Sequence, residues 1–143
     1  GRLDADSEGL ILLTNDGEFA EIVSSAGEHM PKVYHVKVRS TPEEEELVRL
    51  RKGVRLKTGV QLAPCRIVPI RGKETNWFEV TLTQGKNRQI REMFESIGRP
   101  VQKLRRVRIG FLTSDGLAVG QYRRLRPLEV ERILRIGRRA RKK

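Results

Sequence analysis

The sequence predicts a mixed α/β domain. Two patterns support this class: runs in which apolar and polar residues alternate, as in a half-buried strand, and runs in which apolar residues recur every three or four positions, as in an amphipathic helix. Of the 143 residues, 37% are hydrophobic and 34% are charged, a balance typical of a folded domain with a polar surface. A chain of this length can bury a hydrophobic core, and the sequence contains no internal repeat.

The first predicted elements are a strand, a helix and a second strand. Four consecutive apolar residues at 10–13 precede a Thr-Asn-Asp-Gly turn signal, so we expect a buried core strand there. Apolar residues at helical spacing predict a short amphipathic helix over 18–25. Residues 32–39 alternate as a strand, which places Tyr34 on the same face as two valines.

A second helix is predicted to begin at Thr41 and to end at Gly53. Thr41 is the expected N-cap, Pro42 occupies the first helical position, and Glu44 completes a capping box. Gly53 provides the glycine that commonly follows a helix. Further strands are predicted at 54–57, 65–71 and 76–83.

A third helix is predicted over 88–97, where it is stopped by Gly98. Arg88 and Arg91 are expected on its exposed face, with Lys86 in the loop before it. Free backbone N–H groups at a helix amino end, next to such cations, form a ready phosphate site.

The last predicted elements are a long strand over 101–113, a returning strand over 120–125 and a final helix that begins at Pro127. The inward residues of this helix are expected to be Leu128, Ile133 and Leu134. The basic residues 138–143 are predicted to form a mobile tail.

The positive charge is concentrated in two segments. The net charge is +12, from 30 basic and 18 acidic residues. Residues 85–108 carry eight basic and two acidic residues, residues 123–143 carry ten and two, and the rest of the chain is slightly negative. Such segregation is typical of a protein that binds a polyanion, most simply a nucleic acid, although general solubility would also explain a basic surface.

Other classes of site receive little support from the sequence. The single cysteine, Cys65, excludes an internal disulfide, and with only two histidines besides it the chain does not suggest a zinc site. No apolar run is long enough to cross a bilayer, and the amino end has no signal-peptide pattern. We therefore expect a cytoplasmic protein without a metal site.

Asp4 is the candidate reactive residue. It lies two residues after Arg2 and a few residues before the predicted strand at 10–13, where rigid backbone can present a side chain to a cleft. A turn-forming aspartate would also fit this position. The pattern Asp-x-Asp-x-Glu-Gly at 4–9 is similar to the start of a calcium loop, but the twelfth position is Asn15 and not a bidentate glutamate.

Four sequence motifs follow one another in a defined order. They are Gly-Arg-Leu-Asp at 1–4 with Gly-Leu-Ile-Leu-Leu-Thr-Asn-Asp-Gly at 9–17, Lys-x-Tyr at 32–34, Gly-Lys-Asn-Arg-Gln-Ile-Arg at 85–91, and Lys-Leu-x-Arg-x-x-Ile-Gly at 103–110. In this order they closely resemble the motifs of the RsuA-like ribosomal RNA pseudouridine synthases. The resemblance extends over nearly the whole chain.

The resemblance implies roles for individual residues. The aspartate of Gly-Arg-Leu-Asp, here Asp4, is the essential catalytic residue of the family. The tyrosine of Lys-x-Tyr, here Tyr34, packs against the target base, and the arginine that ends Gln-Ile-Arg, here Arg91, pairs with the catalytic carboxylate. The residues expected to contact RNA are Arg2, Lys32, Lys86, Asn87, Arg88, Lys103, Arg105 and Arg106.

The implied activity is isomerisation of a specific uridine in ribosomal RNA to pseudouridine. The 23S RNA of the large subunit is favoured, with 16S RNA as the close alternative, and the uridine is expected in a loop or stem-loop. The base leaves the ribose through N1 and is rejoined through C5, so no cofactor is implied. Asp4 could act as a nucleophile or as a base, and the sequence does not choose between these routes.

Two further expectations concern the protein as a whole. We expect a monomer. A non-catalytic RNA-binding module, such as a ribosomal or ribosome-assembly protein, is the alternative from a different functional class.

The resemblance also implies a domain organisation. Residues 1–137 are expected to form a catalytic domain of the pseudouridine synthase type, with a mixed, largely antiparallel sheet flanked by helices, and residues 138–143 a basic tail. We expect the chain to lack the N-terminal part of this domain and the S4-like RNA-binding domain that members commonly carry. Two departures from the family pattern are modest: Ser7 replaces the usual threonine, and Glu92 replaces a usual basic residue.

Overall fold

The structure of the chain is a computed structural model that describes residues 2–84 and 88–142. The strands are β1 (Glu8–Gly9), β2 (Lys32–Val38), β3 (Arg66–Pro69), β4 (Trp77–Leu82), β5 (Val101–Ile109) and β6 (Leu112–Thr113). The helices are α1 (Gly17–Ser25), α2 (Glu44–Lys52), α3 (Gln89–Ser96) and α4 (Pro127–Arg141), with a 3₁₀ turn at Gly27–His29.

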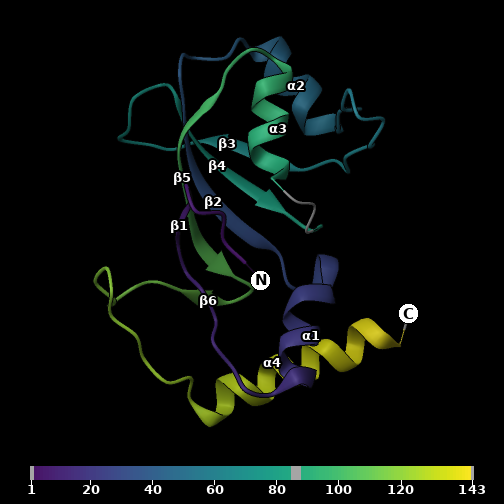
Figure 1. Cartoon of the computed structure of the whole chain (residues 1–143), viewed down its shortest axis with the longest axis vertical. Helices are drawn as coiled ribbons and strands as arrows, with labels where there is room; N and C mark the ends of the chain where they lie inside the picture. The colour runs from purple at the N-terminus through teal and green to yellow at the C-terminus, as the bar shows by residue number, and fades with distance from the viewer. Residues whose placement is uncertain (1, 85–87, 143) are drawn as a thin grey trace.

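Within the described residues, the strands form one six-stranded sheet (Figure 1). The strand order is β1-β5-β2-β4-β3, and β6 pairs with β5. β1 runs parallel to β5, whereas the other strand pairs are antiparallel. The prediction of a mixed, largely antiparallel sheet flanked by helices is therefore confirmed.

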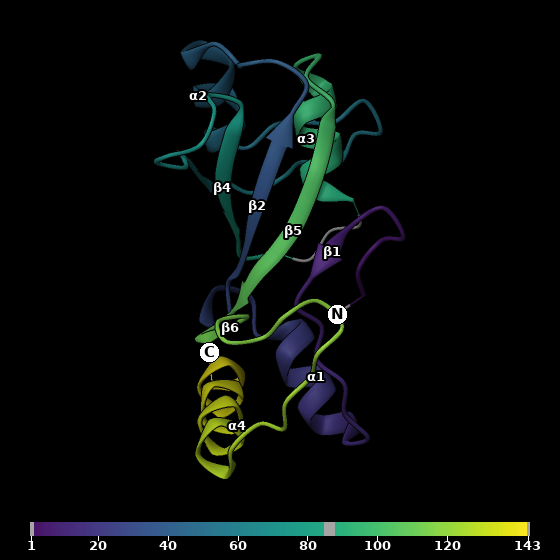
Figure 2. The same ribbon diagram turned by 90° about the vertical axis from the view of Figure 1, so that its left-hand side faces the viewer.

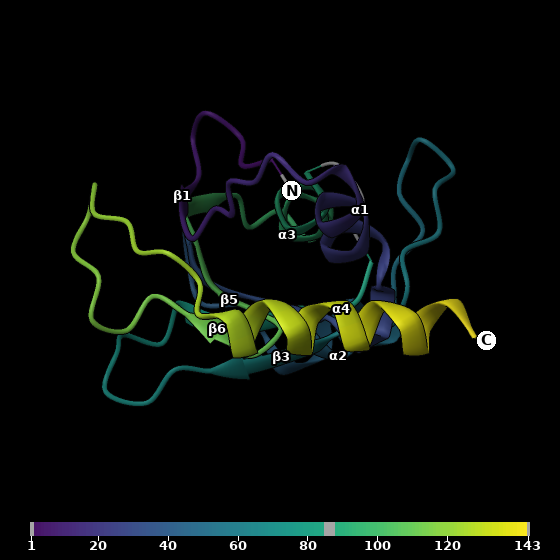
Figure 3. The ribbon, with the colours of Figure 1, turned by 90° about the horizontal axis from the view of Figure 1, so that it is seen from below.

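The chain encloses two hydrophobic cores. Helices α2 and α3 pack on one face of the sheet and lie behind it in Figure 2. Val36 and Val38 of β2 are fully buried in this first core, and Tyr34 packs against it, as the alternation in 32–39 predicts. Helices α1 and α4 lie side by side at the other end of the molecule and form the second core with β6 (Figures 1 and 3).

The prediction of a buried core strand at 10–13 is wrong. β1 ends at Gly9, and Leu10 makes the last backbone bond to β5, its N–H donating to the Arg106 carbonyl oxygen at 2.8 Å. Leu10 and Leu12 then pack against the second core, whereas the side chains that alternate with them are exposed. Because the segment passes along one edge of a core instead of through it, only every second side chain is buried.

Helix α2 begins two residues later than predicted. Its N-cap is Glu43, which forms a capping box with Glu46. The hydroxyl of Thr41, the expected cap, lies instead 2.6 Å from the hydroxyl of Thr75 and is not available to the helix. Gly53 ends the helix as predicted.

Three predicted strands differ in the structure. At 54–57 only an isolated bridge forms. The long strand predicted at 101–113 is divided into β5 and β6, because Gly110 adopts a positive φ of 58° and turns the chain back on itself. Residues 120–125 lead into α4 as a loop and not as a strand.

The other predicted elements are present with small changes in their ends: 18–25 as α1, 32–39 as β2, 65–71 as β3, 76–83 as β4 and 88–97 as α3.

Helix α4 starts at Pro127, as predicted, but it continues to Arg141, so residues 138–141 are helical and do not form a mobile tail. Ile133 is buried, whereas Leu128 is 77% exposed, contrary to prediction. Five residues separate the two, which places their side chains about 140° apart around the helix. Neither α4 nor any other helix of the described residues is long and apolar enough to cross a membrane.

Cys65 is expected to react slowly with alkylating agents. Burial raises the pKa of its thiol to about 11, although the charge of Arg51 opposes this. Since only the thiolate is nucleophilic, iodoacetamide near neutral pH should modify Cys65 about a hundredfold more slowly than an exposed cysteine. Mass spectrometry of the folded and the denaturant-unfolded chain would measure this, and rapid labelling of the folded chain would contradict it.

Candidate active site

A cleft of about 560 Å³ lies where the two cores meet. Strands β2, β4 and β5 form its floor, the start of α3 lines one side, and the end of α1 with the turn after it lines another. The amino-terminal segment contributes its first side chains. Six of the residues predicted from the sequence line the cleft: Arg2, Asp4, Lys32, Tyr34, Arg88 and Arg106.

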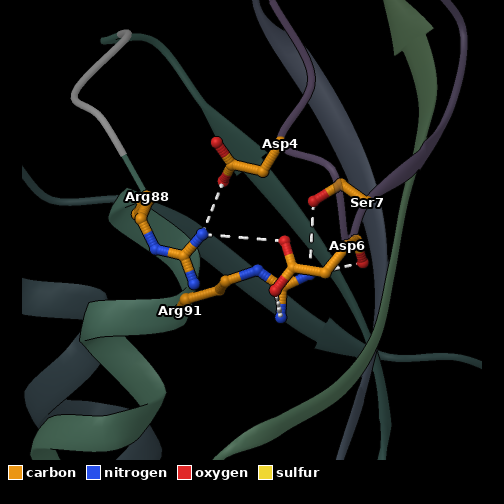
Figure 4. Close-up of polar contacts among 5 residues, drawn as sticks. All are labelled: Asp4, Asp6, Ser7, Arg88 and Arg91. Atoms are coloured by element: carbon orange, nitrogen blue, oxygen red, sulfur yellow. Dashed lines mark hydrogen bonds and ion pairs between the residues drawn. The ribbon is translucent and has the colours of Figure 1, made fainter.

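Asp4 lines this cleft with its side chain 32% exposed. Its Oδ2 lies 3.4 Å from Nη1 of Arg88, and the same Nη1 lies 3.6 Å from Oδ1 of Asp6 (Figure 4). The arginine that pairs with Asp4 in this structure is therefore Arg88 and not Arg91, which corrects the pairing implied by the resemblance.

Arg91 instead holds the loop that carries Asp4. Its Nη2 donates to the Asp6 carbonyl oxygen at 2.8 Å and to the Ser7 hydroxyl at 3.2 Å, and its Nη1 lies 3.4 Å from the Asp6 carboxylate (Figure 4). The Ser7 N–H in turn donates to the Asp4 carbonyl oxygen at 2.9 Å. The Arg91 side chain is only 10% exposed, so the prediction that it lies on the exposed face of α3 is wrong.

Arg88 is held in an unfavourable backbone conformation. It is the N-cap of α3 and has a φ of 52°, the only positive φ of a non-glycine residue among those described. Such a conformation costs about 1–3 kcal/mol and is typical of functional sites, where the surrounding structure enforces it. Here it places the guanidinium between the carboxylates of Asp4 and Asp6.

The floor of the cleft combines an aromatic ring with a partly buried lysine and a buried arginine. Tyr34 lies opposite Arg106 in the sheet. The Lys32 ammonium donates to the Val23 carbonyl oxygen at 2.7 Å; burial lowers the pKa of Lys32, and the charge of Arg106 lowers it further. Arg106 is buried, and its Nε donates to the Leu10 carbonyl oxygen at 3.0 Å.

Not every predicted RNA-binding residue belongs to the cleft. Lys103 and Arg105 alternate with Arg106 along β5, so they project from the opposite face of the sheet. Lys86 and Asn87 lie outside the described residues.

Asp6 and Ser7 also belong to the site, although this role is not predicted for them from the sequence. Asp6 contacts both Arg88 and Arg91, and Ser7 accepts a hydrogen bond from Arg91. Their role could have been predicted from residue spacing. Two arginines three residues apart at the start of a helix lie close together, so two aspartates two residues apart can form ion pairs with them.

The arrangement suits a reaction on a nucleotide. A carboxylate next to a guanidinium can act as nucleophile or base, an aromatic ring can stack on a base, and the cations can contact phosphates. Within residues 2–84 and 88–142, no three His, Cys, Asp or Glu side chains are grouped as a metal site would require.

The sequence and the fold are similar to those of known proteins. Residues 1–96 match the family described as RNA pseudouridylate synthase. The chain is 43% identical over 136 residues to the ribosomal large subunit pseudouridine synthase B of Bacillus subtilis, covering 93% of this chain and 55% of that protein. It is 40% identical over 139 residues to the ribosomal large subunit pseudouridine synthase E of Vibrio parahaemolyticus, covering 87% of this chain and 58% of that protein.

A solved structure has the same fold. The crystal structure of a pseudouridylate synthase is 30% identical in sequence and matches with a TM-score of 0.83, covering 93% of this chain and 57% of that one. The chain thus spans just over half the length of these relatives.

Proposed function

Because the chain belongs to the RNA pseudouridylate synthase family, and within it to the RsuA-like ribosomal type, we propose that it isomerises a specific uridine of ribosomal RNA to pseudouridine. Two relatives are named for the large ribosomal subunit, which favours 23S RNA as the substrate over 16S RNA. The observation that carries the proposal is that Asp4 and Tyr34 line one cleft together with several cations.

Asp4 is the proposed catalytic carboxylate. The glycosidic bond between uracil N1 and the ribose breaks, the base turns, and a new bond forms between C5 and the same ribose carbon. The C5 proton leaves and N1 gains one, so the atoms of product and substrate are the same and no cofactor is needed. The carboxylate either attacks the ribose or removes a proton from it, and both routes need it ionised and held close to the sugar.

The target uridine is proposed to enter the cleft by leaving its stack. The cleft volume of about 560 Å³ suits a single nucleotide rather than a duplex. Tyr34 offers a ring on which the uracil can stack, a contact worth about 1–3 kcal/mol. Because unstacking costs less where the base is unpaired, a loop or stem-loop is the proposed context.

The test is release of tritium from uridine labelled at C5, with small- and large-subunit ribosomal RNA assayed separately. Release from large-subunit RNA alone supports the proposal in full, and release from small-subunit RNA alone moves the substrate to that subunit. RNA binding without release from either RNA would favour a non-catalytic RNA-binding module. Light scattering of the same sample would test the proposed monomer, and cell fractionation the proposed cytoplasmic location.

Arg91→Gln is expected to impair the site more than Arg88→Gln. Loss of the buried Arg91 guanidinium leaves the Asp6 carbonyl oxygen and the Ser7 hydroxyl without their donor, so Asp4 loses its support. We expect kcat to fall roughly 100-fold with little change in KM, and the free energy of unfolding to fall by about 2 kcal/mol.

Arg88→Gln is the variant with which Arg91→Gln is compared, because both arginines contact the same loop from the start of α3. The Arg88 side chain is 44% exposed and its ion pairs are screened by solvent, so we expect roughly a tenfold loss of kcat and almost no change in Tm. A variant series in which Arg88→Gln lowers Tm and Arg91→Gln does not would contradict this assignment of positioning to Arg91.

A further inference from the structure

The sheet has a second face that α2 and α3 leave uncovered. Figure 2 shows β4, β2 and β5 in front with both helices behind them. A groove of about 810 Å³ runs along this face, lined by strand residues that alternate with the core residues and by the loop after β6. We define the open face by the side chains of Lys37, Arg66, Lys103, Arg105 and Arg108, with His35 and Glu79 between them.

Cations are placed next to one another on the open face by the strand register. Lys37 of β2 lies directly opposite Lys103 of β5. Directly opposite residues have Cβ atoms about 4.5–5.5 Å apart, where like charges repel and destabilise the sheet. The sheet therefore keeps a repulsive arrangement that an external anion would relieve.

The carboxylates near this face do not neutralise its cations. Glu79 is engaged by His35 at 3.2 Å, and Asp115 is exposed in the loop after β6. Glu8, also among the described residues, is the register partner of Arg105 across the β1–β5 ladder but forms no ion pair with it. Among the residues that the structure describes, none of the five cations of the open face has a carboxylate oxygen within 4.0 Å.

The basic segment of α4 is arranged differently. Arg123 lies 2.8 Å from Glu129, Arg135 lies 3.1 Å from Glu131, and Arg132 stacks over the ring of Phe111 at 4.1 Å. With the pair between Arg141 and Glu18 at 3.5 Å, three of the ten basic residues in 123–143 form ion pairs within the described residues. The five cations of the open face, in contrast, are gathered on one side of the sheet, and none of them forms an ion pair within the described residues.

We propose that the open face is a second RNA-binding surface, which holds the phosphate backbone of a part of the ribosomal RNA outside the cleft. The inference rests on the proposed function, because it takes RNA as the partner. Lys103 and Arg105 are about 6.7 Å apart along β5, as are all strand residues two positions apart, which suits successive phosphates of one strand. Phosphate contacts of this kind orient a protein on RNA without reading its sequence.

The first test compares the salt dependence of binding to a short RNA hairpin for the parent chain and for Lys37→Gln/Lys103→Gln/Arg105→Gln. Each phosphate contact contributes about 0.7–0.9 to the slope of log affinity against log salt concentration. The slope measured for the variant should be less steep by about 2, and the variant should bind the hairpin at least roughly tenfold more weakly than the parent chain at low salt.

The matched control removes the same charge elsewhere. Lys52, Arg55 and Lys57 are exposed cations at the end of α2 and in the loop after it, away from both the cleft and the open face. Lys52→Gln/Arg55→Gln/Lys57→Gln should keep the parent slope. An open-face variant that keeps the parent slope, or a control that loses as much as the open-face variant, overturns the proposal.

The second test needs no variant and reports the location directly. RNA should slow acetylation of Lys37 and Lys103 in the parent chain, measured by mass spectrometry, and leave Lys52 and Lys57 unprotected. Equal protection of all four lysines by RNA overturns the proposal. So does a result in which polyglutamate protects Lys37 and Lys103 as well as RNA does, which would indicate an acidic protein partner. Both tests measure binding and not product, so failure of the proposed isomerisation would appear only in the tritium assay.

Discussion

Asp4→Asn is expected to abolish pseudouridine formation while RNA affinity stays unchanged. Asparagine has nearly the shape of aspartate but is neither a nucleophile nor a base at neutral pH, so the rate should fall at least about 1,000-fold. The Asp4 backbone stays tied to Ser7, and the RNA-binding cations are untouched. Tritium release measures the reaction, and filter binding of the same RNA measures affinity.

Asp6→Asn is the matched control for Asp4→Asn. Asp6 lies two residues away and its carboxylate contacts the same Arg88 guanidinium, but its backbone carbonyl, which Arg91 binds, survives the change. We expect this variant to keep activity within about tenfold, because the Asp6 side chain is 54% exposed and Arg91 keeps its bonds to the Asp6 carbonyl oxygen and the Ser7 hydroxyl. If Asp4→Asn releases tritium at the parent rate, Asp4 is not the catalytic carboxylate.

Gly9→Ala is expected to destabilise the chain and to remove activity with it. Gly9 has a φ of 115° and pairs with Arg106 in the parallel β1–β5 ladder, where an added Cβ would overlap the backbone oxygen of Arg106. Strain and overlap together should lower the free energy of unfolding by about 2–5 kcal/mol and Tm by roughly 10 °C. As β1 moves away from β5, the loop with Asp4 leaves the cleft, so kcat should fall even below the new Tm.

Gly59→Ala separates backbone strain from crowding. Gly59 also has a positive φ, 90°, but an added Cβ would meet no atom within 4 Å. We expect it to lower the free energy of unfolding by only about 1 kcal/mol and to leave kcat unchanged. Thermal unfolding followed by circular dichroism would compare the two variants, and equal Tm losses would show that crowding against Arg106 has no effect.

Elements with a strong local pattern were predicted well from the sequence. The alternation in β2 and the helical spacing in α1 and α3 depend on neighbours a few residues away, and the structure confirms all three. One error occurs where a distant residue intervenes, and another depends on a single residue within the predicted strand. Thr41 contacts Thr75 and cannot cap α2, and Gly110 divides a run that reads as one strand.

The sequence predicted several residues of the candidate site but not how they contact one another. Sequence motifs led to Asp4 and Tyr34, and the fold places both in one cleft. Periodicity assigned Arg91 to an exposed helix face, whereas the loop of Asp6 and Ser7 covers it. A segment more than eighty positions away along the chain buries this side chain, and no local pattern carries that information.

Local periodicity and the ordered motifs were enough to predict the fold class, the family and the residue types of the site. The folded chain was needed to show which arginine meets Asp4 and which face of the sheet each cation of β5 occupies. Register is the physical reason: a shift of one residue along β5 would exchange Arg105 and Arg106 between the open face and the cleft.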